Sequence, residues 1–174
     1  QRVVLVRHNS YLFKGTVDEN LKMAKPDATK EEMEAVLQKV NLLGFLQTQD
    51  GLQTQLLEKA SNLSGGQCQR LVIARALLRT DSAVYIFDEA ASNIDVESEE
   101  LIMNVIHELA KTKTVLLISH RLANVVKSDK IYFLKDGEIK ESGKHDELMS
   151  RNGAYRHLYE NQMALENYGK GGVA

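Results

Sequence analysis

The sequence predicts an α/β fold with a mainly parallel sheet into which a helical segment is inserted. Short apolar runs rich in β-branched residues alternate with segments of helical periodicity, as in sheets whose faces are covered by helices. Residues 15–80 interrupt this alternation, because they carry several helix signals but no clear apolar strand. We therefore expect one partial domain over residues 1–174, with a helical subdomain at 15–80. Residues 1–14 and 81–174 are expected to form the α/β core and the C-terminal helices.

The composition is that of a soluble globular protein. Apolar residues make up 43% of the chain and charged residues 26%. The net charge of −2 argues against general binding to nucleic acids or anionic membranes. The single cysteine, Cys68, excludes an internal disulfide and is expected to be a small residue within a helix. No apolar run approaches the roughly 20 residues that span a bilayer, and no signal peptide is recognised.

Four strands are expected from short apolar runs. They are Val3–Val6, Ala83–Phe87, Thr114–Ser119 and Ile131–Leu134. The dipeptide Asp136-Gly137 after the last of them is a hairpin signal, because both residues tolerate the positive φ of a tight turn.

Capping boxes mark two helix starts within the helical segment. Thr16 with Glu19, and Thr29 with Glu32, have the spacing at which side chains and backbone amides exchange hydrogen bonds. Further helices are expected at Gly66–Leu78, Val96–Ala110, Lys144–Met149 and Ala154–Glu166.

The segment Leu63-Ser64-Gly65-Gly66-Gln67 has the properties of a phosphate contact. Two glycines at a helix start let backbone N–H groups approach an anion closely. The helix dipole adds positive potential there, and Ser64 adds a hydroxyl donor. The alternative is an ordinary Ser-capped helix with a glycine-rich entry, and these five residues alone leave both open.

The run from Ala83 to Phe87 ends in two adjacent carboxylates, Asp88 and Glu89. Burying charge is costly unless it is used, and ligands of open α/β sheets bind at the carboxyl ends of the strands. Asp88 could hold Mg²⁺, and Glu89 could polarise an attacking water. The alternative is a helix N-cap followed by an acid in the first turn.

His120 follows the next apolar strand and is therefore expected at the same sheet edge as Asp88. An imidazole there could donate a hydrogen bond to a phosphate oxygen. A histidine in this position taken alone is more often structural.

Together these segments resemble the ATP-binding cassette (ABC) family, in the family's order and over nearly the whole chain. Leu63–Gln67 is the same as the family's signature motif, and Val84–Glu89 resembles its Walker B strand. Ser92–Asp95 resembles the D-loop, and Ile118–Arg121 the segment with the switch histidine. The resemblance implies a truncated P-loop NTPase-like core.

The resemblance also implies roles and cofactors. Glu89 and His120 would be catalytic, Asp88 would hold Mg²⁺, and Asp95 would be the D-loop aspartate. The cofactors would be ATP and Mg²⁺. The signature residues would contact ATP held by a second ABC domain, identical or not. They are Ser64, Gly65, Gly66 and Gln67.

The flanking segments resemble exporters whose ATPase is fused to a membrane domain. Tyr11–Leu21 is similar to the segment after their Q-loop, and Gly137–Leu148 with Gly153–Tyr155 to their C-terminal block. These flanks argue against a soluble ATPase for DNA or translation. The implied partner is therefore a transmembrane domain, and the implied location is the cytoplasmic face of the cell membrane.

The sequence departs from the family pattern in three places: at the P-loop, at the Q-loop and in the segment just before the signature. No P-loop, G-x-x-x-x-G-K-[ST], occurs in the 174 residues, so ATP hydrolysis by this chain alone is not expected. The chain opens on Gln1 within an apparent strand, which we interpret as a position inside a longer polypeptide. His8 stands at the Q-loop glutamine, where an imidazole nitrogen suits Mg²⁺ less well than an oxygen. Either the site turns over slowly or couples differently, or a neutral His8 substitutes through a water, and both interpretations stay open. Thr54–Ala60 is a loose version of the exporters' segment that touches the membrane domain.

The predicted function is the ATP-binding and ATP-hydrolysing domain of an ABC exporter. The alternative is a degenerate domain that only supplies its signature motif to a partner's ATP site. His8 favours this alternative, and the presence of Glu89 and His120 speaks against it.

Overall fold

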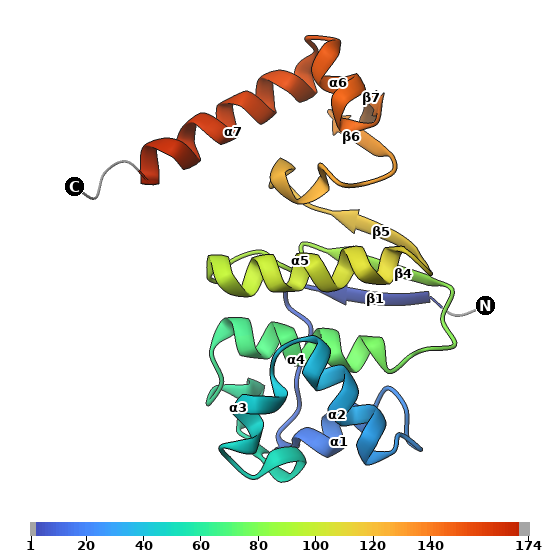
Figure 1. Ribbon diagram of the computed structural model, residues 1–174, viewed down its shortest axis with the longest axis vertical. Coiled ribbons are helices and arrows are strands. Elements are labelled where there is room, and N and C mark those ends of the chain that lie inside the picture. The colour runs from blue at the N-terminus through green and yellow to red at the C-terminus, as the bar shows by residue number, and fades with distance from the viewer. Residues whose placement is uncertain (1–2, 171–174) are drawn as a thin grey trace. The chain divides into compact units, whose positions relative to one another are not determined.

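The computed structural model describes residues 3–170 of the chain (Figure 1). The chain divides into two compact units, Gln1–Ile118 and Ser119–Ala174, and each unit is considered by itself. Among the described residues, every helix is too short or too polar to cross a lipid bilayer.

A three-stranded parallel sheet in the order β1-β4-β5 forms the base of the first unit. Its strands are β1 (Val3–Arg7), β4 (Val84–Asp88) and β5 (Thr114–Ile118). Arg7 pairs with Asp88, and Asp88 with Ile118, so the three carboxyl ends lie at one edge. The sheet confirms the predicted α/β class, and β4 is its central strand.

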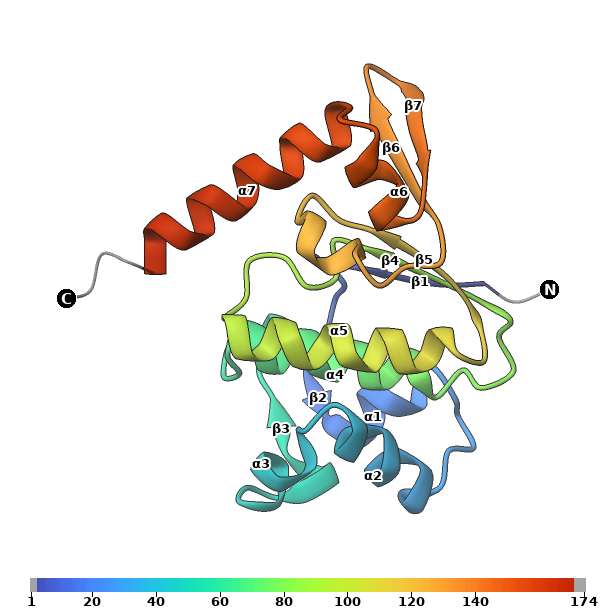
Figure 2. The same ribbon diagram turned by 45° about the horizontal axis from the view of Figure 1, so that its top comes forward.

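Two helices, α4 (Gly65–Leu77) and α5 (Val96–Ala110), lie on the same side of this sheet (Figure 2). Side chains alternate along each strand, so one face points toward these helices and the other away from them. On the helix side, Val4, Val6, Tyr85 and Phe87 are buried. On the opposite side, the large apolar residues Val3, Leu5, Leu116 and Ile118 are between 44% and 51% exposed.

Between β1 and β4 the chain is mainly helical, with α1 (Val17–Lys22), α2 (Lys30–Lys39) and α3 (Leu43–Gln47) before α4. Both predicted capping boxes, at Thr16 and Thr29, are present. A two-residue antiparallel pair, β2 (Gly15–Thr16) with β3 (Gln55–Leu56), was not predicted. Short 3-10 turns at Gly51–Gln53 and Glu58–Ala60 flank β3. The subdomain boundary at residues 15–80 stays a prediction.

The second unit contains an antiparallel hairpin and two helices. After a 3-10 turn at Leu122–Val125 come β6 (Ile131–Lys135), β7 (Glu138–Gly143), α6 (His145–Ser150) and α7 (Ala154–Lys170). The hairpin turns at the predicted Asp136-Gly137, where φ is 53° and 77°.

Tyr155 anchors the start of α7 within the second unit. Its side chain is fully buried, and its hydroxyl lies 2.9 Å from Nδ1 of His145 at the start of α6. Burial raises the pKa of Tyr155 to about 12, so the phenol stays protonated at any physiological pH.

Candidate nucleotide site

The signature segment begins α4 as a capping box. The Ser64 hydroxyl oxygen accepts a hydrogen bond from the Gln67 N–H at 3.2 Å, and the Ser64 N–H donates to Gln67 Oε1 at 2.9 Å. Ser64 and Gly65 are exposed to solvent. The capping bond uses one lone pair of the Ser64 hydroxyl oxygen and the Gln67 N–H. The hydroxyl proton of Ser64 can still be donated to an anion. The capping and phosphate-binding interpretations are therefore compatible.

The two signature glycines have different surroundings. A Cβ at Gly65 would have Ile94 Cγ2, at 4.0 Å, as its nearest contact. A Cβ at Gly66 would lie 2.3 Å from Ser98 Oγ and 2.8 Å from Asp95 Oδ2. Gly66 is buried, and it lets the start of α4 approach the start of α5. Packing thus requires a glycine at Gly66, whereas at Gly65 it does not.

Asp95 is the N-cap of α5, and its carboxylate accepts a hydrogen bond from the Ser98 N–H at 2.8 Å. This bond, with a weaker contribution from the Ser98 hydroxyl and the positive charge of Arg70, lowers the pKa of Asp95. Arg70 itself binds the backbone carbonyls of Gly66 and Asn41 at 3.3 and 3.1 Å. The predicted D-loop aspartate is therefore in contact with the signature helix of the same chain.

The carboxylate pair lies at the carboxyl edge of the sheet, as predicted. Asp88 is the last residue of β4, and its side chain is partly exposed. Glu89 follows in the left-handed region, with φ at +53°, and its N–H donates to the Ile118 carbonyl at 2.9 Å. This backbone conformation is strained for a residue other than glycine, and strained residues are often found at functional sites. The bend turns the chain out of the sheet directly after Asp88.

His8 lies beside this pair at the end of β1. Its N–H donates to the Asp88 carbonyl at 3.2 Å. Nε of Arg7 is 3.8 Å from Asp88 Oδ2, but both side chains are well exposed, so the ion pair contributes little stability. Among residues 3–170, no three His, Cys, Asp or Glu side chains are grouped to hold a metal. One carboxylate nevertheless fits Mg²⁺, which commonly completes its shell with water and substrate phosphates.

Sequence reasoning missed two residues that join α4 to the segment after β1. Gln69 Nε2 donates to the Arg7 carbonyl at 3.4 Å, and Arg75 donates to the Tyr11 carbonyl at 2.8 Å. Gln69 is buried and shares a helix face with Val72 and Ala76. A polar residue in line with buried apolar positions was the signal that could have revealed it.

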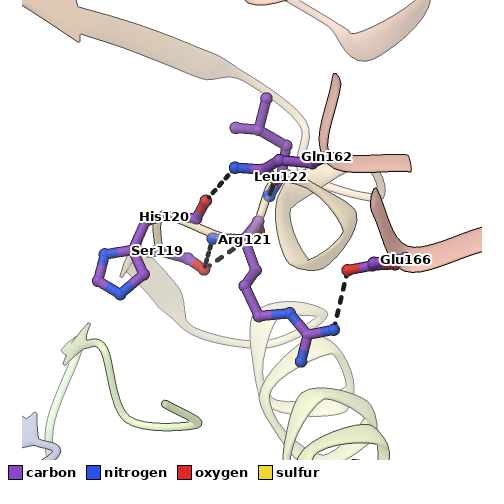
Figure 3. Close-up of polar contacts among 6 residues, drawn as sticks. All are labelled: Ser119, His120, Arg121, Leu122, Gln162 and Glu166. Atoms are coloured by element: carbon purple, nitrogen blue, oxygen red, sulfur yellow. Dashed lines mark hydrogen bonds and ion pairs between the residues drawn. The ribbon is translucent and has the colours of Figure 1, made fainter. Parts of the chain in front are cut away.

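Residues 119–122, called the switch segment from here on, belong to the second unit, and side chains hold their backbone (Figure 3). The Ser119 hydroxyl accepts from the Arg121 N–H and donates to the Arg121 carbonyl, both at 3.1 Å. Gln162 of α7 accepts from the Leu122 N–H at 2.9 Å and donates to the His120 carbonyl at 2.7 Å. Gln162 was not predicted, since nothing in its sequence surroundings links it to residue 120.

The comparisons with known proteins agree with these motifs. Residues 1–92, which include the signature and the carboxylate pair, match the family model described as ABC transporter. The chain belongs to the ABC transporter family. This ABC chain is 53% identical over 166 residues, 95% of its length, to a Haemophilus influenzae protein named as an uncharacterized ABC transporter ATP-binding protein. ATPase activity is the function of this family.

Two further relatives of the ABC chain are named as exporters. It is 42% identical to an ATP-dependent lipid A-core flippase of Vibrio vulnificus, over 91% of its length. It is 40% identical to a putative multidrug export ATP-binding/permease protein of Staphylococcus aureus, over 92% of its length. The chain spans only 30% of the length of the Haemophilus protein, 27% of the flippase and 28% of the multidrug export protein.

A solved structure has the same fold as the ABC chain. A bacterial Atm1-family ABC exporter with ATP bound matches 92% of the chain, with a TM-score of 0.84 and 30% sequence identity. The match covers 28% of that exporter chain. The α/β class and the family assignment from the sequence are both confirmed.

Proposed function

We propose that this chain is the signature-bearing part of the ATPase in an ATP-driven membrane exporter. The observation that carries the proposal is the placement of Asp88 and Glu89 at the carboxyl edge of the parallel sheet, at the end of its central strand. Asp88 would be a ligand of Mg²⁺, which neutralises phosphate charge when bound. Glu89 would orient and polarise the attacking water, and His120 would donate a hydrogen bond to the γ-phosphate. His8, with an exposed side chain, would approach the metal only through water.

The signature would act on ATP held by a second ABC domain. Ser64 and Gly65 are exposed at the start of a 13-residue helix, so their donors can reach a phosphate outside this chain. Gly66 serves this contact indirectly, by letting α4 pack on Asp95 and Ser98. Gln67 keeps the Ser64 backbone in place through the capping box. The partner would be a second copy or a related domain.

A separate surface would meet the transmembrane domain at the cytoplasmic face of the membrane. Tyr11 and Phe13 form an edge-to-face pair, with ring centroids 4.8 Å apart, and are 42% and 45% exposed. Leu57, 53% exposed, follows β3, whose partner strand β2 begins two residues after Phe13. Exposed aromatic and aliphatic side chains on neighbouring segments are the usual anchors of a protein interface.

Hydrolysis in the full-length protein tests the catalytic roles. Glu89→Gln is expected to lower the rate of ATP hydrolysis by about 100-fold or more, because glutamine cannot act as a base. ATP binding should be kept, because the substitution adds no negative charge beside the phosphates. Glu97→Gln, an exposed acid in the first turn of α5, is the matched control and should leave the rate unchanged. An unchanged rate in Glu89→Gln would favour the degenerate domain that supplies only its signature.

Gly65→Ala tests the contact in trans. Outside the adjacent residues and the backbone of its own helix, the nearest atom to the added methyl group is Ile94 Cγ2 at 4.0 Å, so the fold should be intact. We expect weaker ATP-dependent dimerisation of the full-length protein or its ATPase domains, measured by light scattering, because the methyl group would stand between the helix start and the phosphate. Unchanged dimerisation would contradict the role of the signature.

A further inference from the structure

Residues 119–121 link β5 to the 3-10 turn and have no regular structure themselves, yet two side chains satisfy four consecutive polar groups of residues 120–122. They are the His120 carbonyl, the N–H and carbonyl of Arg121, and the Leu122 N–H. Ser119 binds the middle two from within the segment. Gln162 binds the outer two from α7, 40 and 42 residues further along the chain.

Gln162 binds this backbone as a neighbouring β-strand would. Its amide oxygen accepts from one residue, and its amide nitrogen donates to the residue two positions earlier. Such a two-point contact fixes both the position and the orientation of the peptide groups between them. A single hydrogen bond would allow the segment to rotate about it.

The same face of α7 carries two more contacts within the second unit. Residues seven and eleven positions apart lie on one face of a helix, and Tyr155, Gln162 and Glu166 have this spacing. Tyr155 anchors the helix through its buried ring and its contact with His145. Glu166 forms an ion pair with Arg121 at 3.0 Å. The helix is thus fixed at one end and holds the switch segment two turns further on.

The side chain of His120 is directed elsewhere. In Figure 3 its imidazole points away from Gln162, while its carbonyl points toward the Gln162 amide. His120 is exposed, and the clamp binds its backbone carbonyl.

We propose that Gln162 is a positioning residue for His120, and that α7 sets the position of the switch segment 119–122. This inference rests on the proposed role of His120 at the γ-phosphate. A donor must lie within a few tenths of an ångström of its place to stabilise developing charge, and a displacement of about 1 Å can cost on the order of 100-fold in rate. Gln162 would thereby affect hydrolysis without touching nucleotide.

Two variants separate the two hydrogen bonds. Gln162→Ala removes both. Gln162→Glu keeps an acceptor for the Leu122 N–H but replaces the donor to the His120 carbonyl with a second oxygen. Asn161→Ala, at the exposed preceding position of α7, is the matched control.

Hydrogen–deuterium exchange in the full-length protein tests the clamp itself. The Leu122 amide should exchange faster in Gln162→Ala than in the wild type, and at the wild-type rate in Gln162→Glu and Asn161→Ala. An unchanged exchange rate in Gln162→Ala overturns the clamp, whatever the function of the protein.

ATP hydrolysis tests the positioning role. Both Gln162 variants should lower kcat by about 10-fold with little change in KM, because a misplaced donor affects the transition state more than binding. In a His120→Ala background, Gln162→Ala should cause no further loss. An additional loss in that background overturns the positioning role. An unchanged kcat in the Gln162 variants also overturns it, if His120→Ala does impair hydrolysis. If His120→Ala itself has no effect, the proposed function of His120 fails, and the exchange result stands alone.

Discussion

The two glycines of the signature differ at the scale of single atoms. We predict that Gly66→Ala destabilises the 174-residue chain by about 1–3 kcal/mol, because the new Cβ would overlap Ser98 Oγ and Asp95 Oδ2. Gly65→Ala is the matched control and should be neutral or slightly stabilising, since alanine favours helix. The free energy of unfolding, from denaturant titration, measures both.

A second substitution, at Ser98, tests whether the clash causes the loss of stability in Gly66→Ala. Ser98→Gly removes both serine atoms near the new methyl group. The loss caused by Gly66→Ala should therefore be smaller in a Ser98→Gly background. Equal losses in the two backgrounds would contradict the packing account of Gly66.

Asp95 gives the stability of the first unit a pH dependence. Its pKa is lowered by the Ser98 N–H, so folding favours the ionised carboxylate. The stabilisation is present above the unfolded pKa of about 3.9 and is lost as the pH falls through the lower folded value. Asp95→Asn retains a capping oxygen but cannot titrate. We predict that the unfolding midpoint of this variant falls less steeply than that of the wild type below about pH 4.5.

The chemistry-bearing residues were easier to predict from the sequence than the residues that hold them. Ser64, Asp88 and Glu89 stand at element ends, where local patterns of capping and apolar runs fix their place. Gln162 lies 42 residues from His120, and its role depends on how α7 packs within its unit. Such contacts are set by tertiary structure, which a single sequence does not reveal.

At the scale of elements, α4 connects the signature to the segment after β1. Gln69 and Arg75 bind the carbonyls of Arg7 and Tyr11, so one helix holds both ends of the stretch that includes His8. Arg75 is half-buried, and burial lowers its pKa without removing its charge. A movement of α4 would therefore be transmitted directly to this stretch.

Arg75→Met tests this connection. Methionine keeps the apolar stem but removes the donor, and the Tyr11 carbonyl loses its charged partner. We predict a loss of about 1.5 kcal/mol in the free energy of unfolding, and faster hydrogen exchange across residues 8–13. Arg75→Lys keeps a charged donor and should lose less. Equal losses in both variants would show that the hydrogen bond is not what holds the segment.

The elements themselves were predicted to different degrees. Capping boxes at Thr16 and Thr29 predicted α1 and α2 correctly, because the signal is contained within four residues. The pair β2–β3 was missed, because each strand has two residues and the two lie about 40 residues apart in the chain. Strands of this length carry no periodicity from which to recognise them.

At the scale of the whole molecule, the sheet of the first unit has one apolar face that no described helix of its own unit covers. Val3, Leu5, Leu116 and Ile118 are 44–51% exposed on that face, whereas α4 and α5 cover the other. Contiguous apolar side chains of this size favour association when they face water. We predict that the 174-residue chain on its own self-associates at micromolar concentration, as measured by sedimentation velocity.

Two charge substitutions locate the surface responsible for this association. Leu116→Lys places a charge at the middle of β5 on the uncovered face and should shift the chain toward monomer. Ile139→Lys changes a residue that is 60% exposed on the β6–β7 hairpin, and should leave the association unchanged. Both sites are exposed β-strand positions, so they differ mainly in the surface to which they belong.

If Ile139→Lys dissociates the chain and Leu116→Lys does not, the hairpin and not the sheet face drives association. A monomeric wild type would mean that the apolar face is covered in solution, and the residues covering it could then be found by crosslinking from Lys introduced at Leu5.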